Sequence, residues 1–389
     1  MQQVKEPIPS AKKKKEQVPL YRRLLRYIFG VLLGCSALPA IFALPVTNGT
    51  LNLFASFLFF IILMLLTFFL NILIHEAGHL VFGLVSGYTF FSFRILNILL
   101  IRQGNSFKLR RFGIMGTGGQ CLMKPPPWIN NTFPYFLYNF GGVIMNLAGS
   151  AVFALVISLS SGNPYLLSFA LMMYFQGIII AVTNGIPDAI GGIPNDGKNI
   201  VEFGKNPDAL REYWLSMQII ISMNENVRMK DMPADWFPPL SENDLRSNAP
   251  LPFALNHLDR FLEEERWEEA AGLLEIYLKP EREISGHKRN VAQAELVFLE
   301  CILKQRPDRL QSLLSEEHRK FIKLFQKSSP SVFRTQYCCL LFVEKNEDKA
   351  SLHRSQFEKL FKHYPYSNII EGARKEMDLA LAVYQKGNE

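Results

Sequence analysis

The residues best suited to chemistry are two histidines and the glutamate between them, in the run His75-Glu76-Ala77-Gly78-His79. This run matches the H-E-x-x-H pattern. In an α-helix, positions i and i+4 lie on one face, so both imidazoles can bind a single metal ion. Glu76 is turned aside and can reach a metal-bound water, whose pKa zinc lowers to about 7. The run therefore predicts metal-assisted activation of water.

A catalytic zinc takes three protein ligands and keeps a fourth position open. The best candidate for the third ligand is Asp196, which follows Pro194 by two residues and precedes Gly197. We expect an irregular backbone there, which would present the carboxylate inward. Asp188 is the rival. An Asp before Gly also commonly caps a turn, and that structural role is the alternative for Asp196 taken alone.

These residues lie in a chain of 389 residues that is 49% hydrophobic and 20% charged, which excludes a disordered or collagen-like protein. No charged side chain occurs between Tyr27 and Ile74. Because a membrane span needs roughly 20 apolar residues, the hydropathy predicts four transmembrane helices. They cover about residues 24–46, 51–82, 135–159 and 165–186. An ionisable residue inside a span is costly and marks a functional site, although His can also serve as a polar helix-packing patch.

The basic residues predict the orientation of these spans. They gather in residues 1–26, with eight Lys/Arg, and between the second and third spans. Since such residues mark the cytoplasmic side, we expect both termini and residues 88–132 to face the cytoplasm. The net charge of +7 then reflects residues beside the membrane and not a nucleic-acid surface. The five scattered cysteines fit buried or reduced thiols better than a disulfide or metal pattern.

The predicted fold class is an all-α polytopic membrane domain with an interfacial β-hairpin, followed by a soluble α-helical domain. Alternating apolar residues in Tyr88–Met115 predict the hairpin, turning at Gly104-Asn105, and Gly116–Gly119 should break regular structure. Asn206–Met223 has the pattern of an amphipathic helix. A tetratricopeptide-like array and a generic helical domain are both open for the C-terminal part. The expected domains are a basic tail (1–23), a transmembrane domain (24–205), an amphipathic helix with a Pro-rich linker (206–252) and a helical domain (253–389).

Over about residues 51–205, the chain resembles the intramembrane metalloproteases of the site-2 protease family, peptidase family M50. In that family the H-E-x-x-H run lies in a membrane helix. A later N-x-x-P…D-G motif carries the third zinc ligand, and here it is Asn184-x-x-Pro187…Asp196-Gly197. The family also has a G-x-x-x-N element in the intervening helix, here Gly142-Val143-Ile144-Met145-Asn146.

The resemblance implies a role for each matching residue. Zn²⁺ would be held by His75, His79 and Asp196, and Glu76 would be the catalytic base. Asn146 would contact the substrate backbone or the transition state, Asn184 would help to hold the substrate, and Gly142 would belong to the same substrate-binding group.

The chain departs from the commonest family pattern in two ways. Pro187 and Asp196 are nine residues apart, with Gly191-Gly192 between them, which is longer than the shortest family spacing. No PDZ-like β domain is apparent, and the soluble extension has a helical pattern instead.

The function implied by the resemblance is that of a zinc metalloendopeptidase that hydrolyses membrane-embedded or membrane-associated proteins or peptides. The alternating pattern of the 88–122 hairpin, and not the resemblance, suggests that the substrate would bind there as an added strand. The expected partners are that substrate, the lipid bilayer and a protein bound by the helical domain, but no nucleic acid. The expected location is a prokaryotic plasma membrane. The alternatives are a catalytically silent relative that binds membrane peptides as a scaffold, and a transporter or export accessory with a metal-binding His pair.

Overall fold

The computed structural model of the chain describes residues 27, 31, 50–113, 118–160, 163–190, 193–242, 245, 253–282, 284 and 286–388. The predicted basic tail and, apart from residues 27 and 31, the first predicted span lie outside these residues. The chain divides into two compact units. One comprises residues up to Phe68 together with Gly149–Ile179, and the other comprises Phe69–Ala148 and Ile180–Glu389.

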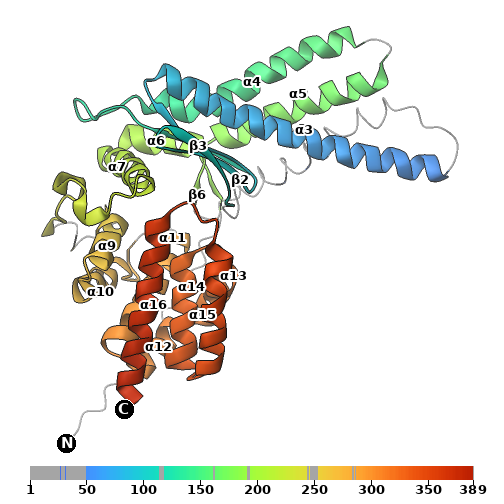
Figure 1. The fold of residues 1–389 in the computed structure, drawn as a ribbon. Helices are drawn as coiled ribbons and strands as arrows, with labels where there is room; N and C mark the ends of the chain where they lie inside the picture. Colours follow the sequence, from blue (N-terminus) through green and yellow to red (C-terminus); the bar gives the residue numbers. More distant parts are fainter. Residues whose placement is uncertain are drawn as a thin grey trace, which may run out of the picture. The chain divides into compact units, whose positions relative to one another are not determined.

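Three described helices are long and apolar enough to cross a membrane, and they agree with the second, third and fourth predicted spans. They are α3 (Thr50–Val85), α4 (Tyr135–Leu159) and α5 (Pro164–Gly185) (Figure 1). Their ends follow from local chemistry. Helix α3 stops before Gly87, whose φ of 84° lies in the left-handed region. Helix α5 begins with a proline at its first position, after Asn163, whose side chain accepts from two backbone N–H groups.

The first unit contains the start of α3, the end of α4 and most of α5. Phe60, Leu63 and Met172 form its buried cluster. Two hydroxyl groups in this unit form hydrogen bonds to backbone carbonyls. Ser150 Oγ donates to the carbonyl of Tyr174 at 3.1 Å, and Thr67 Oγ1 donates to the carbonyl of Leu63 at 2.8 Å. Hydroxyls satisfied by backbone carbonyls are the usual way to keep polar side chains inside an apolar helical bundle.

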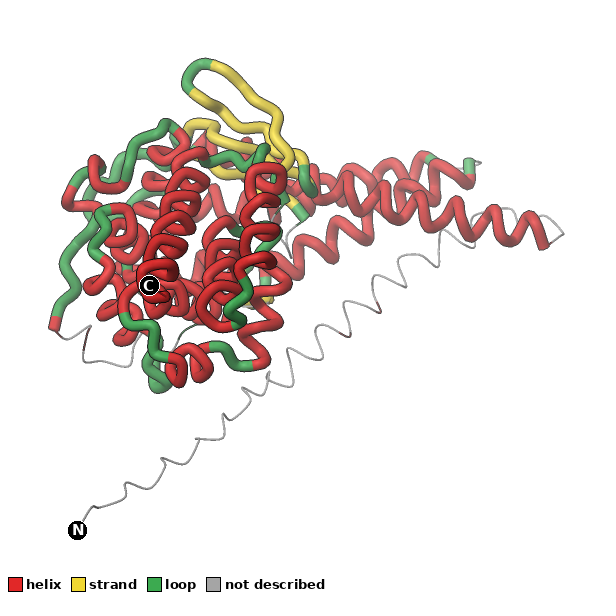
Figure 2. The backbone as a smooth tube through the Cα atoms, turned by 60° about the horizontal axis from the view of Figure 1, so that its bottom comes forward, coloured by secondary structure: helices red, strands yellow, loops and turns green. Residues whose placement is uncertain are grey.

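A four-stranded antiparallel sheet in the second unit replaces the single hairpin predicted for this segment. Its strands are β1 (Thr89–Ile95), β2 (Ile98–Gln103), β3 (Ser106–Arg111) and β4 (Gly119–Lys124), in the order β3-β2-β1-β4. The predicted turn at Gly104-Asn105 is correct, because Gln103 pairs with Ser106. A second tight turn at Leu96, with φ of 52°, was not predicted. Figure 2 shows that the strands gather in one part of the described chain.

The sequence suggested that Gly119 breaks regular structure, but in the structure it is the first residue of β4. This strand pairs with β1 through a register shift between Phe90 and Ser92. As a result β4 and β3 are the two edges of the sheet. One face of the sheet is covered by helix α7 (Pro207–Asn224), in agreement with the amphipathic helix predicted there.

Two further elements lie around α7. Helix α6 (Asp196–Lys205) precedes it and follows the short hairpin of β5 (Ala189–Ile190) and β6 (Ile193–Pro194). The segment predicted as a Pro-rich linker contains the 3₁₀ turns η1 (Met229–Asp231) and η2 (Ala234–Trp236). Met229, Met232 and Phe237 are buried there, so this part of the segment is packed structure.

The C-terminal part is helical, as predicted from Phe253 onward. Its elements are α9 (Ala254–Glu263), α10 (Trp267–Tyr277), α11 (Gly286–Leu303), α12 (Pro307–Leu313), α13 (Glu316–Phe325), α14 (Pro330–Cys338), η3 (Cys339–Val343), α15 (Glu347–Phe361) and α16 (Ser367–Asn388). Helices α11 and α16 each pack beside α14 (Figure 1). Four cysteines, Cys121, Cys301, Cys338 and Cys339, are buried free thiols, in agreement with the sequence analysis. A tetratricopeptide-like repeat remains a prediction.

We expect acid to weaken the C-terminal helices through His318 in α13, which is 1% exposed. Burial lowers the pKa of His318 from 6.5 to about 4, because the charged imidazolium is poorly solvated there. The neutral form favoured by the fold is fully populated above pH 6.5, so this stabilisation is lost as the pH falls from about 6.5 to 4. The loss amounts to about 3 kcal/mol.

Urea unfolding followed by circular dichroism measures this effect at pH 7 and pH 4. The His318→Phe variant is the control, because phenylalanine fills a similar volume beside Phe321 and does not titrate. The acid-induced loss of stability should be about 3 kcal/mol smaller in the variant. An equal loss in both proteins would show that His318 does not carry the pH dependence.

Candidate metal centre

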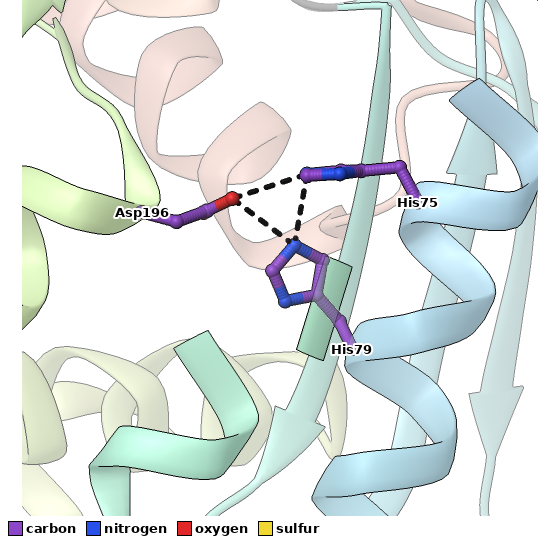
Figure 3. A group of neighbouring side chains, drawn as sticks. All are labelled: His75, His79 and Asp196. Atoms are coloured by element: carbon purple, nitrogen blue, oxygen red, sulfur yellow. Dashed lines mark hydrogen bonds and ion pairs between the residues drawn. The ribbon is translucent and has the colours of Figure 1, made fainter. Parts of the chain in front are cut away.

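Three side chains converge on one point in the second unit: His75 and His79 from α3, and Asp196 from α6 (Figure 3). The Nε2 atoms of the two histidines are 3.3 Å apart. Asp196 Oδ2 lies 3.1 Å from Nε2 of His75 and 3.6 Å from Nε2 of His79. Ligand atoms about 2.0–2.1 Å from a tetrahedral metal lie about 3.3 Å from one another. The three distances therefore fit three ligands of one metal ion.

In each imidazole, the Nδ1 atom forms a hydrogen bond with another part of the protein. Nδ1 of His75 is 2.8 Å from Oδ1 of Asn146, whose Nδ2 in turn donates to the carbonyl of Asn71. Nδ1 of His79 is 2.7 Å from the carbonyl oxygen of Tyr138. Because both partners are acceptors, each Nδ1 carries the proton and donates it. Each Nε2 then keeps its lone pair for a metal, which is the arrangement that outer partners of ligating histidines normally enforce.

Asp196 is positioned by its neighbour Asn195, which sequence reasoning missed. Asn195 caps the start of α6 by accepting from the N–H of Lys198, and its Nδ2 donates to the carbonyls of Thr183 and Ile186 at 2.7 and 2.6 Å. The cap thus fastens the first turn of α6 to the end of α5. Asp196 is consequently the first residue of a helix, and the irregular backbone expected for it was wrong.

The long spacing between Pro187 and Asp196 is accommodated by the β5–β6 hairpin. The hairpin returns the chain to its starting point, where the N–H of Asn195 donates to the carbonyl of Asp188 at 2.9 Å. Gly197 then permits close contact with α5, because a Cβ at this position would lie 2.1 Å from the carbonyl oxygen of Gly185. The glycine of the D-G pair is therefore required by packing.

Asp188, the rival third ligand, lies at the base of that hairpin. Its Oδ1 accepts from the N–H of Ala189 at 2.8 Å. Within the described residues, the carboxylate brought to the two imidazoles is that of Asp196.

Glu76 is 7% exposed and lies against strand β4. A Cβ on Gly119 would be 2.6 Å from Oε1 of Glu76, so only glycine leaves room for the carboxylate. Beside it Arg94 is 1% exposed, and its guanidinium donates to the carbonyls of Leu96 and Gly119 at 2.8 and 3.2 Å. Arg94 is one of the basic residues between the second and third spans that were used to predict the orientation. In the structure it is buried beside Glu76, where its hydrogen bonds stabilise the sheet.

The three residues expected to contact substrate have other contacts in the structure. Asn146 is fully buried and holds His75. Gly142 packs under the same ring, because a Cβ there would lie 2.5 Å from Cε1 of His75. Asn184 donates to the carbonyl of Ile180 within its own helix. Asn146 and Gly142 thus shape the metal ligands directly, and a contact of any of the three with substrate remains a prediction.

The contributions of Tyr138, Asn71 and Gly119 could hardly have been read from the sequence. Tyr138 and Asn71 act through backbone carbonyls, which every residue has. The burial of Arg94 had no signal either, because its alternation with Phe93 and Ile95 favours an exposed position. Comparison with protein-family models, curated proteins and solved structures finds no match to this chain.

Proposed function

We propose that the chain is an intramembrane zinc metalloprotease that hydrolyses membrane-embedded or membrane-associated proteins or peptides. The observation that carries the proposal is the set of two Nε2 atoms and one carboxylate oxygen at metal-ligand spacing, with Glu76 next in the chain to His75. These histidines lie toward the end of a helix long and apolar enough to span a membrane. The resemblance to site-2 proteases supports the same assignment.

In this proposal zinc would supply a Lewis acid and a bound water acidic enough to lose its proton near pH 7. The Glu76 carboxylate takes that proton as general base and delivers it to the leaving amine. Asn146 and the carbonyl of Tyr138 keep the imidazoles in the ligating tautomer. The close contacts at Gly119 and Gly142 hold the carboxylate and the His75 ring in place.

The hydrogen bond between Asn146 and Nδ1 of His75 has a measurable consequence. We expect Asn146→Ala to weaken zinc binding by about 10–100-fold, because His75 loses the acceptor that sets its tautomer. Competition with a chromogenic zinc chelator measures the affinity. Asn139→Ala is the matched control, since Asn139 is a buried asparagine of the same helix whose side chain, within the described residues, donates to the carbonyl of Tyr135 in that helix. Equal losses in both variants would contradict the assignment.

The substrate is proposed to bind as an added strand on β4. A membrane helix hides its carbonyls in i→i−4 bonds, so a substrate must unwind before its peptide bonds can be attacked. An edge strand offers such a segment backbone partners. Strand β4 is an edge of the sheet, and its first residue touches Glu76.

Proline substitution along β4 tests this mode of binding. At positions whose N–H points away from β1, proline removes a donor from the open edge and leaves the sheet paired. We expect kcat/KM to fall at least about tenfold at those positions, as for the loss of one or two good hydrogen bonds. Proline at Phe107 or Leu109, on the opposite edge strand β3, is the control. No effect along β4 would end the added-strand hypothesis.

The proposed function is tested with the full chain in lipid nanodiscs. The substrates are casein, as an unfolded protein, and a set of single-span membrane peptides, with cleavage followed by mass spectrometry. Cleavage that stops with a chelator and returns with Zn²⁺ is the expected result. Saturable peptide binding without cleavage would instead favour a silent scaffold. Cytoplasmic termini, a prokaryotic plasma membrane and a protein partner of the helical domain belong to the same proposal.

A further inference from the structure

A second candidate site lies in the second unit, and its lining includes none of the three metal ligands. It is a half-open pocket of about 600 Å³ between the β2–β3 hairpin, the end of α7 and the connection from α15 to α16. This volume is within the range of about 300–1,000 Å³ that small-molecule sites occupy. The residues that matter for its chemistry are Lys108, Arg110, Asn224, Asn226, Lys362 and Ser367.

Three cations line this pocket: Lys108 and Arg110 from β3, and Lys362 from the end of α15. None of them forms an ion pair or a side-chain hydrogen bond with another residue in the described part of the chain. Nε of Arg110 is buried and also lacks a partner there. Among the lining residues that the structure describes, Glu225 is the single carboxylate, and it forms no ion pair with the three cations. Like charges gathered in this way repel one another, and a multiply charged anion between them would relieve the repulsion.

The strand register places these cations on a definite face. Lys108 pairs with Ile101, and Arg110 pairs with Leu99. Ile101 and Leu99 are 0% and 4% exposed, so this face of the hairpin is the covered one. Arg111, the next residue, points to the opposite face, where Ile98, Leu100, Phe107 and Leu109 are exposed. The two cations of β3 therefore belong to the pocket and not to the apolar face of the sheet.

The walls of the pocket are held together by direct bonds. Nδ2 of Asn224 donates to the carbonyl of Arg102 at 2.9 Å, and its Oδ1 accepts from Gln103 at 3.2 Å. Ser367 Oγ donates to Oδ1 of Asn226 at 3.0 Å. The rings of Phe112 and Tyr364 meet edge to face, with centroids 5.4 Å apart. Each of these contacts joins two of the three segments, so the pocket is preformed.

We propose that this pocket binds a phosphate-bearing anion with at least two negative charges, either a free phosphate compound or the headgroup of an anionic lipid. Arginine offers a bidentate fork to phosphate oxygens and lysine offers point charges, which is the donor set found here. Three cations and Glu225 give the lining a net charge of +2, so a single carboxylate ligand would leave half of it uncompensated. The bound anion would join the β2–β3 hairpin to the C-terminal helices. The inference does not depend on the proposed proteolysis.

Binding of inorganic pyrophosphate to the full chain in uncharged detergent, measured by calorimetry at fixed ionic strength, is the first arm of the test. We expect about one site per chain. Arg110→Gln and Lys362→Gln should each weaken binding at least about tenfold, the usual effect of losing one charge-assisted hydrogen bond. Arg111→Gln is the matched control, because it removes the same charge from the opposite face of the same strand and should leave the affinity unchanged.

The second arm identifies the lipid source. Native mass spectrometry counts cardiolipin, whose headgroup carries two phosphates, retained by the chain after release from nanodiscs of phosphatidylcholine and cardiolipin. If a headgroup is the ligand, wild type and Arg111→Gln keep one more anionic lipid than Arg110→Gln and Lys362→Gln. The proposal is overturned if neither pyrophosphate nor cardiolipin binds. It is equally overturned if Arg111→Gln loses as much as the pocket variants, since that pattern would mark general surface electrostatics.

Discussion

Replacing Glu76 by Gln is expected to reduce peptide-bond hydrolysis by a factor of about 10²–10⁴ while leaving the metal bound. Glutamine has nearly the same shape as glutamate, so the close contact with Gly119 is retained. An amide, however, cannot accept the proton of the attacking water. The three ligand residues are untouched, and metal content should therefore stay at the wild-type value. Cleavage of the membrane peptides in nanodiscs and metal analysis of the same preparation measure both quantities.

Glu212→Gln on α7 is the control for this experiment, because it neutralises another partly buried carboxylate, which pairs with Lys288 at 3.9 Å and is not one of the three ligands. It should cleave at the wild-type rate. A Glu76→Gln variant as active as wild type would exclude Glu76 as the base. If neither wild type nor Glu76→Gln cleaves the peptides and both bind them equally, the silent scaffold is the better account of the chain.

His75→Ala and Asp196→Asn are each expected to weaken metal binding by more than about 100-fold. Loss of a hydrogen-bond partner of a ligand already lowers metal affinity by about 10–100-fold, and these two changes remove a ligand itself. Wild-type protein purified in detergent without chelators should contain about one zinc ion per chain, as a single three-ligand site requires. Both variants should then contain little or none. Elemental analysis by mass spectrometry, scaled to protein concentration, provides the measurement.

Asp188→Asn separates the two candidates for the third ligand. The Asp188 carboxylate caps the N–H of Ala189, and asparagine can do the same, so this variant should retain its zinc. Zinc that disappears with His75→Ala and Asp188→Asn but persists with Asp196→Asn would reverse the assignment. A wild-type protein without zinc would remove the basis of the proposed hydrolysis.

The parts of the protein that depend on local periodicity were predictable from the sequence. Three helices follow from apolar stretches whose length and hydropathy are local properties, and α7 follows from its amphipathic pattern. The placement of His75 and His79 on one face is equally local, because the helix repeat alone brings residues four apart together. The same holds for the turn at Gly104-Asn105, where glycine adopts a φ of 58°.

The sheet was predicted only in part because its edges depend on long-range pairing. Alternation of apolar residues and the turn at Gly104-Asn105 indicated the β2–β3 hairpin, but they could not indicate that β1 lies between β2 and β4 and pairs with both. The burial of Arg94 follows from that order, since Gly119, whose carbonyl it contacts, is brought there by β4. Charge counting treated this residue as exposed, because a sequence shows the charge but not its surroundings.

The sequence by itself determined the chemical types of the metal ligands and the pairing of two of them on one helix. The tertiary structure decided which carboxylate joins them, over a separation of 121 residues from His75 to Asp196. It did so through the β5–β6 hairpin and the cap formed by Asn195, neither of which has a periodic signature. It also turned Asn146 toward His75. These outcomes depend on side-chain packing and on hydrogen bonds between distant segments, which are settled only when the helices and the sheet meet.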